Sequence, residues 1–189
     1  YIDLRLETLS NAYEVKYPVT TGLLLGLTAT KEEIVDDISN LISLLNKNLA
    51  IQEVILQNFR AKKNTLMKNS SEIINDLFLR IIATTRIFAP SHISIQVPPN
   101  LSPDINIFLK SGINDLGGIS PITIDWVNPD HLWPNLNQLK NDISNTSQIM
   151  KKRLPVYPEF IKKEWLSSKI FEKVNNIIDT DGYPKETNE

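Results

Sequence analysis

Short apolar runs alternate with longer amphipathic stretches along most of the chain. The runs at 18–27, 51–59 and 93–97 are rich in β-branched and large apolar residues and predict three buried strands, and a fourth strand-like piece lies at 115–119. Stretches with apolar residues at helical spacing separate and follow these runs. They predict helices at 4–12, 30–47, 71–87, 102–111, 135–152 and 159–178.

This order of elements is typical of successive βα units around a parallel sheet. We therefore predict an α/β fold for residues 1–178, with about four βα units followed by C-terminal helices, and a flexible tail at 179–189. Four such units are about half of a TIM-type barrel, and half a barrel would leave unpaired strand edges. Because Tyr1 also opens what reads as the middle of a longer polypeptide, we expect a fragment that lacks its other half.

Composition narrows the classes of function. The chain has 189 residues, of which 41% are hydrophobic and 22% are charged, as in soluble globular proteins. A formal net charge of -2 provides no basic excess for nucleic acid, and no apolar run approaches the ~20 residues that span a bilayer. The absence of cysteine excludes disulfides and cysteine-ligated metal centres within this chain and favours a cytoplasmic location.

Polar residues follow each predicted strand. In parallel βα folds the working face lies at the carboxyl ends of the strands, so these residues are the candidates for function. Their amides, guanidinium and carboxylate suit hydrogen bonding to a polar heterocycle and a ribityl chain better than acid–base catalysis. The candidates are Gly26, Thr28 and Thr30; Gln57, Asn58 and Arg60; Gln96, Pro98, Pro99 and Asn100; and Asp115, Gly117, Gly118 and Ser120.

Structural roles compete with functional ones at the first strand. Thr30 and Glu33 have the spacing of a capping box, which explains Thr30 better than a ligand contact does. Gly22 and Gly26 could either permit close packing or let the backbone approach a ligand.

The same competition holds for the charged candidates. Arg60 could be a solvated residue of a basic loop or a substrate contact, and Asp115 could cap the turn at 117–118 or act chemically. His92 and His131 have no carboxylates near them at metal-ligand spacing, so we expect no metal site. No Walker, dinucleotide-turn or nucleophile-elbow sequence occurs.

Six blocks carry a resemblance to a known family. The Q-N-F-R-A-K run at 57–62 and the pair Q-V-P-P-N-L at 96–101 and G-G-I-S-P at 117–121 are specific in combination. Together with the blocks below, they resemble the C-terminal half of FO synthase, the radical S-adenosylmethionine (SAM) subunit or domain that closes the deazaflavin ring. The blocks lie at 20–27, 51–62, 95–101, 115–121, 127–129 with 133–134, and 153–158.

The resemblance implies a radical SAM lyase with a TIM-type barrel, of which this chain would be the C-terminal half. It implies SAM and a 4Fe-4S cluster as cofactors, a tyrosine–ribityl-pyrimidine adduct as substrate, the deazaflavin FO as product, and an N-terminal half or subunit as partner. It assigns no catalytic residue. It places Thr21, Gly22, Gly26, Leu56 and Asn58 near the cofactor, and Arg60, Gln96, Asn100, Asp115 and Ser120 near the substrate.

Two departures from the family pattern bear on activity. The family reads G-E-T where this chain has Thr28-Ala29-Thr30, so a carboxylate expected at position 29 is missing. The C-x-x-x-C-x-x-C loop that holds the cluster is also absent, so we expect no radical chemistry from this polypeptide alone. The alternatives are a non-catalytic remnant that binds a ligand or partner and, disfavoured by the lack of a glycine-rich phosphate turn, half of an ordinary TIM-type enzyme.

Overall fold

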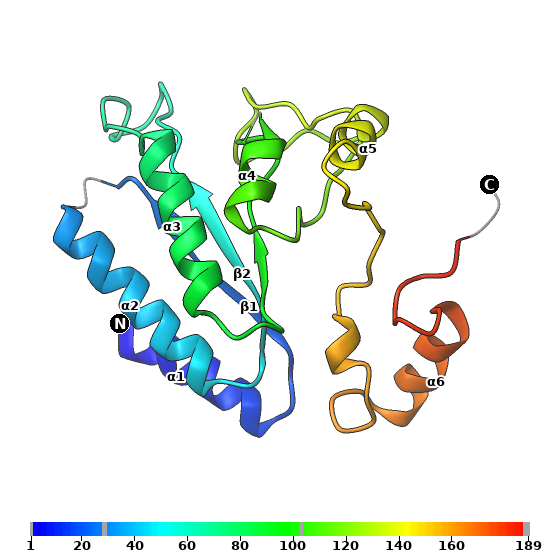
Figure 1. Ribbon diagram of the computed structural model, residues 1–189. Helices are drawn as coiled ribbons and strands as arrows, with labels where there is room; N and C mark the ends of the chain where they lie inside the picture. Colours follow the sequence, from blue (N-terminus) through cyan, green and yellow to red (C-terminus); the bar gives the residue numbers. More distant parts are fainter. Residues whose placement is uncertain (1, 28–29, 103, 187–189) are drawn as a thin grey trace.

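A three-stranded parallel sheet flanked by helices is the centre of the computed structural model, which describes residues 2–27, 30–102 and 104–186 (Figure 1). The strands lie in the order β1-β2-β3. The predicted α/β class with a parallel sheet is therefore confirmed. The described elements are α1 (Ile2–Glu14), β1 (Val19–Leu25), α2 (Lys31–Lys47), β2 (Ile51–Asn58), α3 (Asn75–Phe88), β3 (Ser94–Gln96), α4 (Ile105–Ser111), α5 (Leu136–Ser144), the 3-10 turn η1 (Pro158–Phe160) and α6 (Ser168–Ile177).

Helix α2 begins as the sequence predicts. The Thr30 hydroxyl accepts a hydrogen bond from the Glu33 backbone N–H at 3.2 Å, and the Glu33 carboxylate accepts one from the Thr30 N–H at 2.7 Å. This reciprocal capping box satisfies two donors that a helix start leaves free. The cap therefore accounts for Thr30 without a ligand.

The sheet has a helix face that carries the hydrophobic core. Side chains alternate between the two faces of a strand, and the parallel register aligns residues of the same face across the sheet. On the helix face, apolar side chains of all three strands pack against α2, α3, α4 and α5. The buried members include Leu25, Val54, Leu56, Ile95 and Val97 from the strands and their loops, and Ile38, Leu41, Leu45, Phe78, Ile82, Phe108 and Leu139 from the helices.

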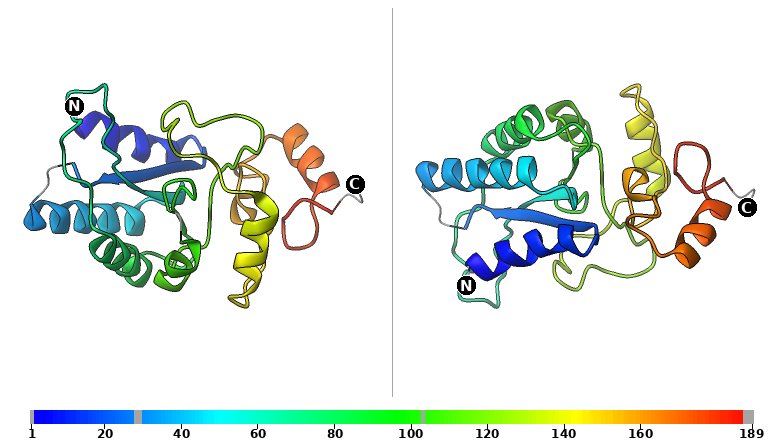
Figure 2. Two further views of the ribbon diagram at one scale, coloured as in Figure 1. Left: turned by 90° about the horizontal axis from the view of Figure 1, so that it is seen from above. Right: turned by 90° about the horizontal axis from the view of Figure 1, so that it is seen from below.

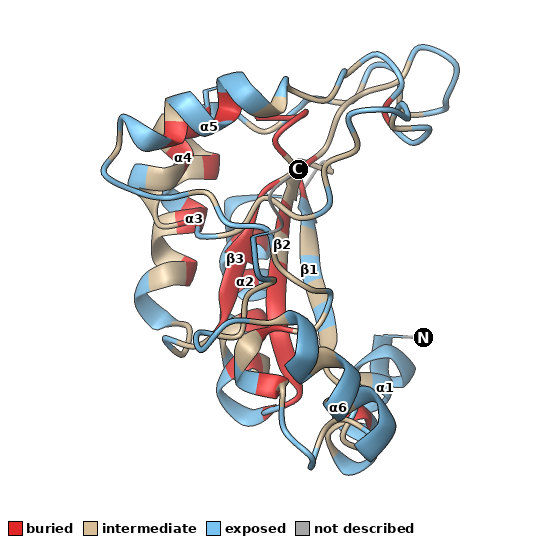
Figure 3. Cartoon of the chain, turned by 90° about the vertical axis from the view of Figure 1, so that its right-hand side faces the viewer, coloured by how far each residue is buried: buried red, intermediate tan, exposed pale blue. Residues whose placement is uncertain are grey.

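The opposite face of the sheet, which we call the open face, is more polar and less covered. The β1 residues on it are exposed, whereas burial is concentrated on β2 and β3 (Figure 3). Helices α1 and α2 lie on opposite sides of β1 (Figure 2). The open face consists of Thr20, Gly22 and Leu24 from β1, Glu53, Ile55 and Gln57 from β2, and Ser94 and Gln96 from β3.

The prediction of a fourth strand at 115–119 is wrong, because the structure describes these residues and gives them no strand. Asp115 makes only an isolated parallel bridge to Gln96. The Asp115 carboxylate accepts a hydrogen bond from the Gly117 N–H at 2.6 Å, and Gly117 has a φ of 67°. This tight turn bends the chain away from the sheet, because a strand cannot continue through a left-handed residue.

Four helices are shorter than predicted: α4 begins at Ile105 instead of 102, and the other three have local causes. Helix α3 begins at Asn75 because Glu72 is held beside the preceding loop by Arg60 and by the Ala61 N–H. Helix α5 ends at Ser144, where a Ser-Asn-Thr-Ser run offers the backbone competing hydrogen bonds. The helix expected at 159–178 is divided into η1 and α6, and Trp165 packs edge-on against Phe160 between them.

The end of the described chain forms a small turn. The Asp179 carboxylate accepts hydrogen bonds from the Asp181 and Tyr183 N–H groups, and Ile178 bridges to Pro184. The flexibility predicted for residues 179–189 stays a prediction. None of the helices in the described ranges is both long and apolar enough to cross a membrane.

Candidate functional site

A group of five polar residues, which we call the charged cluster, lies on the open face. It comprises Thr20, Glu53, Asp115, Arg153 and Tyr157. Arg153 binds both carboxylates, with its Nε 2.6 Å from Asp115 Oδ2 and its Nη2 3.0 Å from Glu53 Oε1. The Tyr157 hydroxyl lies 2.8 Å from Glu53 Oε1 and 2.9 Å from Asp115 Oδ2, and the Thr20 hydroxyl donates to Glu53 Oε2 at 2.9 Å. The cluster joins β1, β2, the turn after β3 and the 153–157 segment.

Burial dominates the electrostatics of the charged cluster. The Glu53 side chain is only 7% exposed, and burial, aided by the charge of Asp115, raises its pKa even though Arg153 lies 3.0 Å away. Burial and the same two carboxylates raise the pKa of Tyr157 far above its ordinary value, so the phenol stays protonated. Burial opposes the charge of Arg153, but hydrogen bonds to Asp115 outweigh it and raise the pKa of the guanidinium.

A bulge in β2 attaches the 153–157 segment to the sheet. Val19 pairs with Ile51 and Thr20 pairs with Glu53, so Gln52 has no partner on β1. Its side-chain amide donates to the Pro155 carbonyl at 3.1 Å and accepts from the Tyr157 N–H at 3.1 Å. A bulge re-aims one side chain of a strand, and here it directs a carboxamide at a distant backbone.

A second group, which we call the strand-end cluster, lies where β2 and β3 end. It comprises Asn58, Arg60, Asn100 and Ser102. The amide of Asn58 and the guanidinium of Arg60 both donate to the Leu101 carbonyl, at 3.1 Å and 2.7 Å. Asn58 lies five positions after Glu53 along β2, so the two clusters are roughly 16 Å apart at ~3.3 Å per residue.

Unpaired polar atoms distinguish the strand-end cluster. Each of its four residues has a buried side-chain atom that makes no hydrogen bond. Among the described residues only one further buried side-chain atom lacks a partner, so most of these atoms belong to the two segments, 58–60 and 100–102, that meet at the Leu101 carbonyl. The atoms are Asn58 Oδ1, Arg60 Nε, Asn100 Oδ1 and Ser102 Oγ, with Asn106 Oδ1 elsewhere on α4.

Two long loops flank the strand-end cluster and are linked to it. The Asp125 carboxylate accepts hydrogen bonds from the side-chain amides of Asn100 and Asn128, both at 2.9 Å. The Lys62 ammonium donates to the Val127 carbonyl and joins the loop after β2 to the loop that contains Asp125. The loops are therefore ordered around the strand ends by polar contacts rather than by an apolar core.

The ten residues implied by the family resemblance do not form one group. Asn58 and Arg60 meet at the carbonyl of Leu101, the residue after Asn100, while Asp115 belongs to the charged cluster and Gln96 lies beside it. The Leu56 side chain is buried in the core, and Thr21 faces the same side of the sheet. The Ser120 hydroxyl accepts hydrogen bonds from Thr123. Position 29, where the family carboxylate is missing, lies outside the described residues, and the binding roles of all ten stay predictions.

The glycines of the first strand have structural reasons to be glycine. A Cβ at Gly22 would lie 2.1 Å from the Ile55 carbonyl oxygen, so close pairing of β1 with β2 requires its absence. Gly26 has a φ of +101°, and a Cβ there would lie 2.8 Å from the Ile73 N. The packing explanation is therefore sufficient for both, and a ligand role would be additional.

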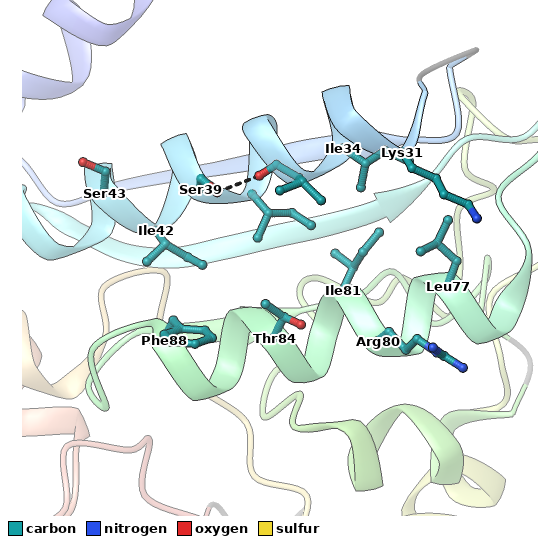
Figure 4. A pocket seen from close by; sticks show the side chains of 12 residues that line it. Lys31, Ile34, Ser39, Ile42, Ser43, Leu77, Arg80, Ile81, Thr84 and Phe88 are labelled. Atoms are coloured by element: carbon teal, nitrogen blue, oxygen red, sulfur yellow. Dashed lines mark hydrogen bonds between the residues drawn. The ribbon is translucent and has the colours of Figure 1, made fainter.

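A separate apolar groove of about 620 Å³ lies between α2 and α3 (Figure 4). All of its lining residues belong to these two helices, with Ile34, Ile42, Leu77 and Phe88 among them. It contains no residue of either cluster. Over the described ranges, no group of three His, Asp or Glu side chains is placed to hold a metal ion.

Comparison with curated proteins gives the family context. The chain is 43% identical over 172 residues to the 7,8-didemethyl-8-hydroxy-5-deazariboflavin synthase of Methanocaldococcus jannaschii, covering 90% of this chain and 48% of that protein. The synthase of Methanosarcina barkeri is 39% identical over 183 residues (97% and 55%), and that of Archaeoglobus fulgidus is 35% identical over 183 residues (97% and 56%). The chain is homologous to the C-terminal half of these deazariboflavin synthases.

The chain spans about half the length of the curated synthases that it matches. No protein-family model matches the chain, and no solved structure shows a significant match. The resemblance inferred from the sequence blocks is confirmed.

Sequence reasoning missed most of the charged cluster. Of its members only Asp115 is among the candidates, because the strand pattern points to residues that follow strands and the other four do not follow one. A signal was present: Gln52-Glu53 is a polar pair inside an otherwise apolar run, and Arg153 and Tyr157 lie in another block that resembles the synthases. Buried polar residues in a strand predict partners, although the sequence does not say which.

Proposed function

We propose that this chain is the C-terminal half of a radical SAM barrel enzyme, a carbon–nitrogen lyase that forms the deazaflavin FO from a tyrosine–ribityl-pyrimidine adduct. Homology over 90–97% of the chain to synthases with this product in their name supports the proposal. The parallel sheet, with α2, α3, α4 and α5 packed on one face and a more polar open face on the other, is compatible with part of a barrel wall.

The observation that carries the proposal is the set of unpaired atoms in the strand-end cluster. A buried polar atom without a partner costs roughly 1–3 kcal/mol, and such atoms are commonly completed by water or a bound ligand. Two amide oxygens, a hydroxyl and a guanidinium N–H offer both acceptors and a donor. This set fits a ligand with N–H, O–H and carbonyl groups, such as a ribityl pyrimidine or the polar parts of SAM.

Within this proposal, Asn58 acts on the cofactor side, and Arg60 and Asn100 act on the substrate side. Gly22 and Gly26 would contact the cofactor through their backbone, as would Thr21 and Leu56, whose side chains face the helices. Gln96, Asp115 and Ser120 remain proposed substrate contacts. The role of Asp115 would be indirect, because Arg153, Tyr157 and Gly117 already occupy both of its carboxylate oxygens.

The iron–sulfur cluster does not fit this chain. Cysteine thiolates are its usual ligands, and the sequence has no cysteine. We propose that its ligands come from a partner equivalent to the other half of the synthases. Strand β1 offers an edge for that partner, because among the described residues it pairs with β2 alone.

The exposed apolar residues beside this edge support docking there. Leu24 on β1 is 48% exposed, and α1 exposes Ile2, Leu4 and Leu6. We propose that a strand of the partner adds beside β1 and that these side chains become buried against it.

The test is co-expression of the chain with the N-terminal half of the Methanocaldococcus jannaschii synthase, followed by anaerobic cluster reconstitution. We expect the two halves to co-purify and to produce deazaflavin fluorescence when SAM and the adduct are added. Leu24→Lys should abolish co-purification, whereas Leu132→Lys, at a loop residue that is 75% exposed, should not. Co-purification without product, with SAM intact, would favour a non-catalytic binding fragment.

A further inference from the structure

The charged cluster has one hydroxyl hydrogen placed between two carboxyl groups. The Tyr157 oxygen lies 2.8 Å from Glu53 Oε1 and 2.9 Å from Asp115 Oδ2, and both are hydrogen-bond distances. A phenol carries a single hydrogen and can make one strong donor bond. If both acids were ionised, one carboxylate would face the phenol without a full hydrogen bond, so the geometry calls for a second proton.

Asp115 is the acid that receives the larger share of hydrogen-bond donors. Arg153 binds it through two parallel contacts, Nε to Oδ2 at 2.6 Å and Nη2 to Oδ1 at 3.0 Å. The Gly117 N–H adds a third donor at 2.6 Å to Oδ1. A fork-shaped guanidinium pair with a backbone donor is the arrangement that a carboxylate, not a carboxylic acid, requires.

Glu53 is left with the weaker share of positive charge. It receives one contact from Arg153, at 3.0 Å, from a nitrogen that also serves Asp115. Its other oxygen meets the Thr20 hydroxyl, which can accept a hydrogen bond as well as donate one. The charged or titratable groups that interact with the Glu53 carboxyl are Asp115 from the turn after β3, and Arg153 and Tyr157 from the 153–157 segment.

We propose that Glu53 carries a proton at neutral pH and donates it to the Tyr157 oxygen, while the Tyr157 hydroxyl donates to Asp115. The cluster then contains one anion and one cation and is neutral overall. When Glu53 ionises, its carboxylate faces Asp115 across a single phenol and repels it. The contribution of the charged cluster to holding the 153–157 segment on the open face consequently depends on this proton.

The sign of the pH dependence follows from this arrangement. Burial raises the pKa of Glu53 in the folded chain above its unfolded value. The folded state therefore binds this proton more tightly, and the contribution to stability is full below the unfolded pKa and is lost as the pH rises through the folded pKa. A salt-bridged Glu53 with a depressed pKa would give the opposite dependence.

The matched pair Glu53→Gln and Asp115→Asn tests the proposal in the full chain by thermal unfolding from about pH 5 to about pH 9. The carboxamide that Glu53→Gln introduces imitates a neutral carboxyl, so this variant should unfold near the temperature of the unsubstituted chain at the acid end. It should unfold at a higher temperature at the alkaline end, because it cannot ionise. Asp115→Asn should lower the unfolding temperature across the range.

Equal destabilisation by both substitutions at neutral pH would overturn the proposal. A second measurement requires no variant: the carbon-13 resonance of the Glu53 carboxyl should have the shift of a protonated acid at neutral pH and should titrate above its ordinary range. The Tyr157 amide resonance should change along the same titration curve. A Glu53 resonance typical of a carboxylate at neutral pH would equally refute the proposal.

Discussion

Two polar clusters lie on the same sheet and differ in how completely they are paired. In the charged cluster, Arg153 and Tyr157 reach Glu53 from about a hundred residues away, and the cluster contributes none of the unpaired buried atoms of the described residues. In the strand-end cluster, two donors share the Leu101 carbonyl while four side-chain atoms have no partner. The first arrangement holds distant parts of the chain together, and the second leaves binding capacity unused, as a ligand site does.

The largest effect should come from removing the cation of the charged cluster. Arg153→Ala would leave two carboxyl groups buried beside each other without their common partner. Breaking a buried ion pair in this way typically costs about 3 kcal/mol of unfolding free energy. Urea denaturation of the variant and the unsubstituted chain measures this loss.

Arg60→Ala is the control from the strand-end cluster. Its ion pair with Glu72 is partly exposed, and the arginine keeps one nitrogen unpaired, so we expect a loss of roughly 1 kcal/mol or less. Equal losses for the two arginines would remove the distinction between a cluster that stabilises the fold and one that does not.

A smaller loss of stability should separate a glycine that the fold requires, Gly22, from one that it does not, Gly118. Gly22→Ala places a methyl group against the Ile55 carbonyl at 2.1 Å, and forcing β1 and β2 apart should cost roughly 1–3 kcal/mol. Gly118→Ala meets nothing within 4 Å and should change stability by about 0.5 kcal/mol or less. Chemical denaturation of both variants measures the difference, and a neutral Gly22→Ala would contradict the close pairing of the strands.

The substitution with the smallest effect on stability, Ser102→Ala, should nevertheless weaken ligand binding. Ser102→Ala removes a buried hydroxyl that has no partner, so the unfolding free energy should stay within about 0.5 kcal/mol or rise slightly. In the complex of the two halves, the same variant should weaken ligand binding by about threefold to tenfold, the value of one lost hydrogen bond. Denaturation and equilibrium binding measure the two effects, and a large loss of stability would mean that Ser102 has a structural partner.

Local pattern was sufficient for the parts of the fold that local forces decide. The strands at 51–58 and 94–96 and the Thr30 capping box follow from runs and spacings within about ten residues. At 115–119 the apolar residues favour a strand, whereas the Asp115 turn and the left-handed Gly117 decide the conformation. A turn that depends on two residues outweighs a weak strand preference.

Only about half of the candidate site could be predicted from the sequence. Asn58, Arg60 and Asn100 could be selected because the carboxyl ends of parallel strands lie on one edge. Glu53 could not be joined to Arg153 and Tyr157, because no local rule connects residues a hundred positions apart. No sequence pattern selects Ser102, because its unpaired hydroxyl becomes apparent only when the burial of neighbouring groups is known.

Gln52 has one further consequence for how the 153–157 segment is held. Its carboxamide has the same donor and acceptor as a peptide group, and it meets Pro155 and Tyr157 as one residue of a neighbouring strand would. The segment thus receives ladder-like bonding from a side chain and adds no strand to the sheet. If the 153–157 segment left the sheet, it would expose the Gln52 carboxamide, which water can solvate. It would not expose a row of unpaired backbone groups, which promotes aggregation.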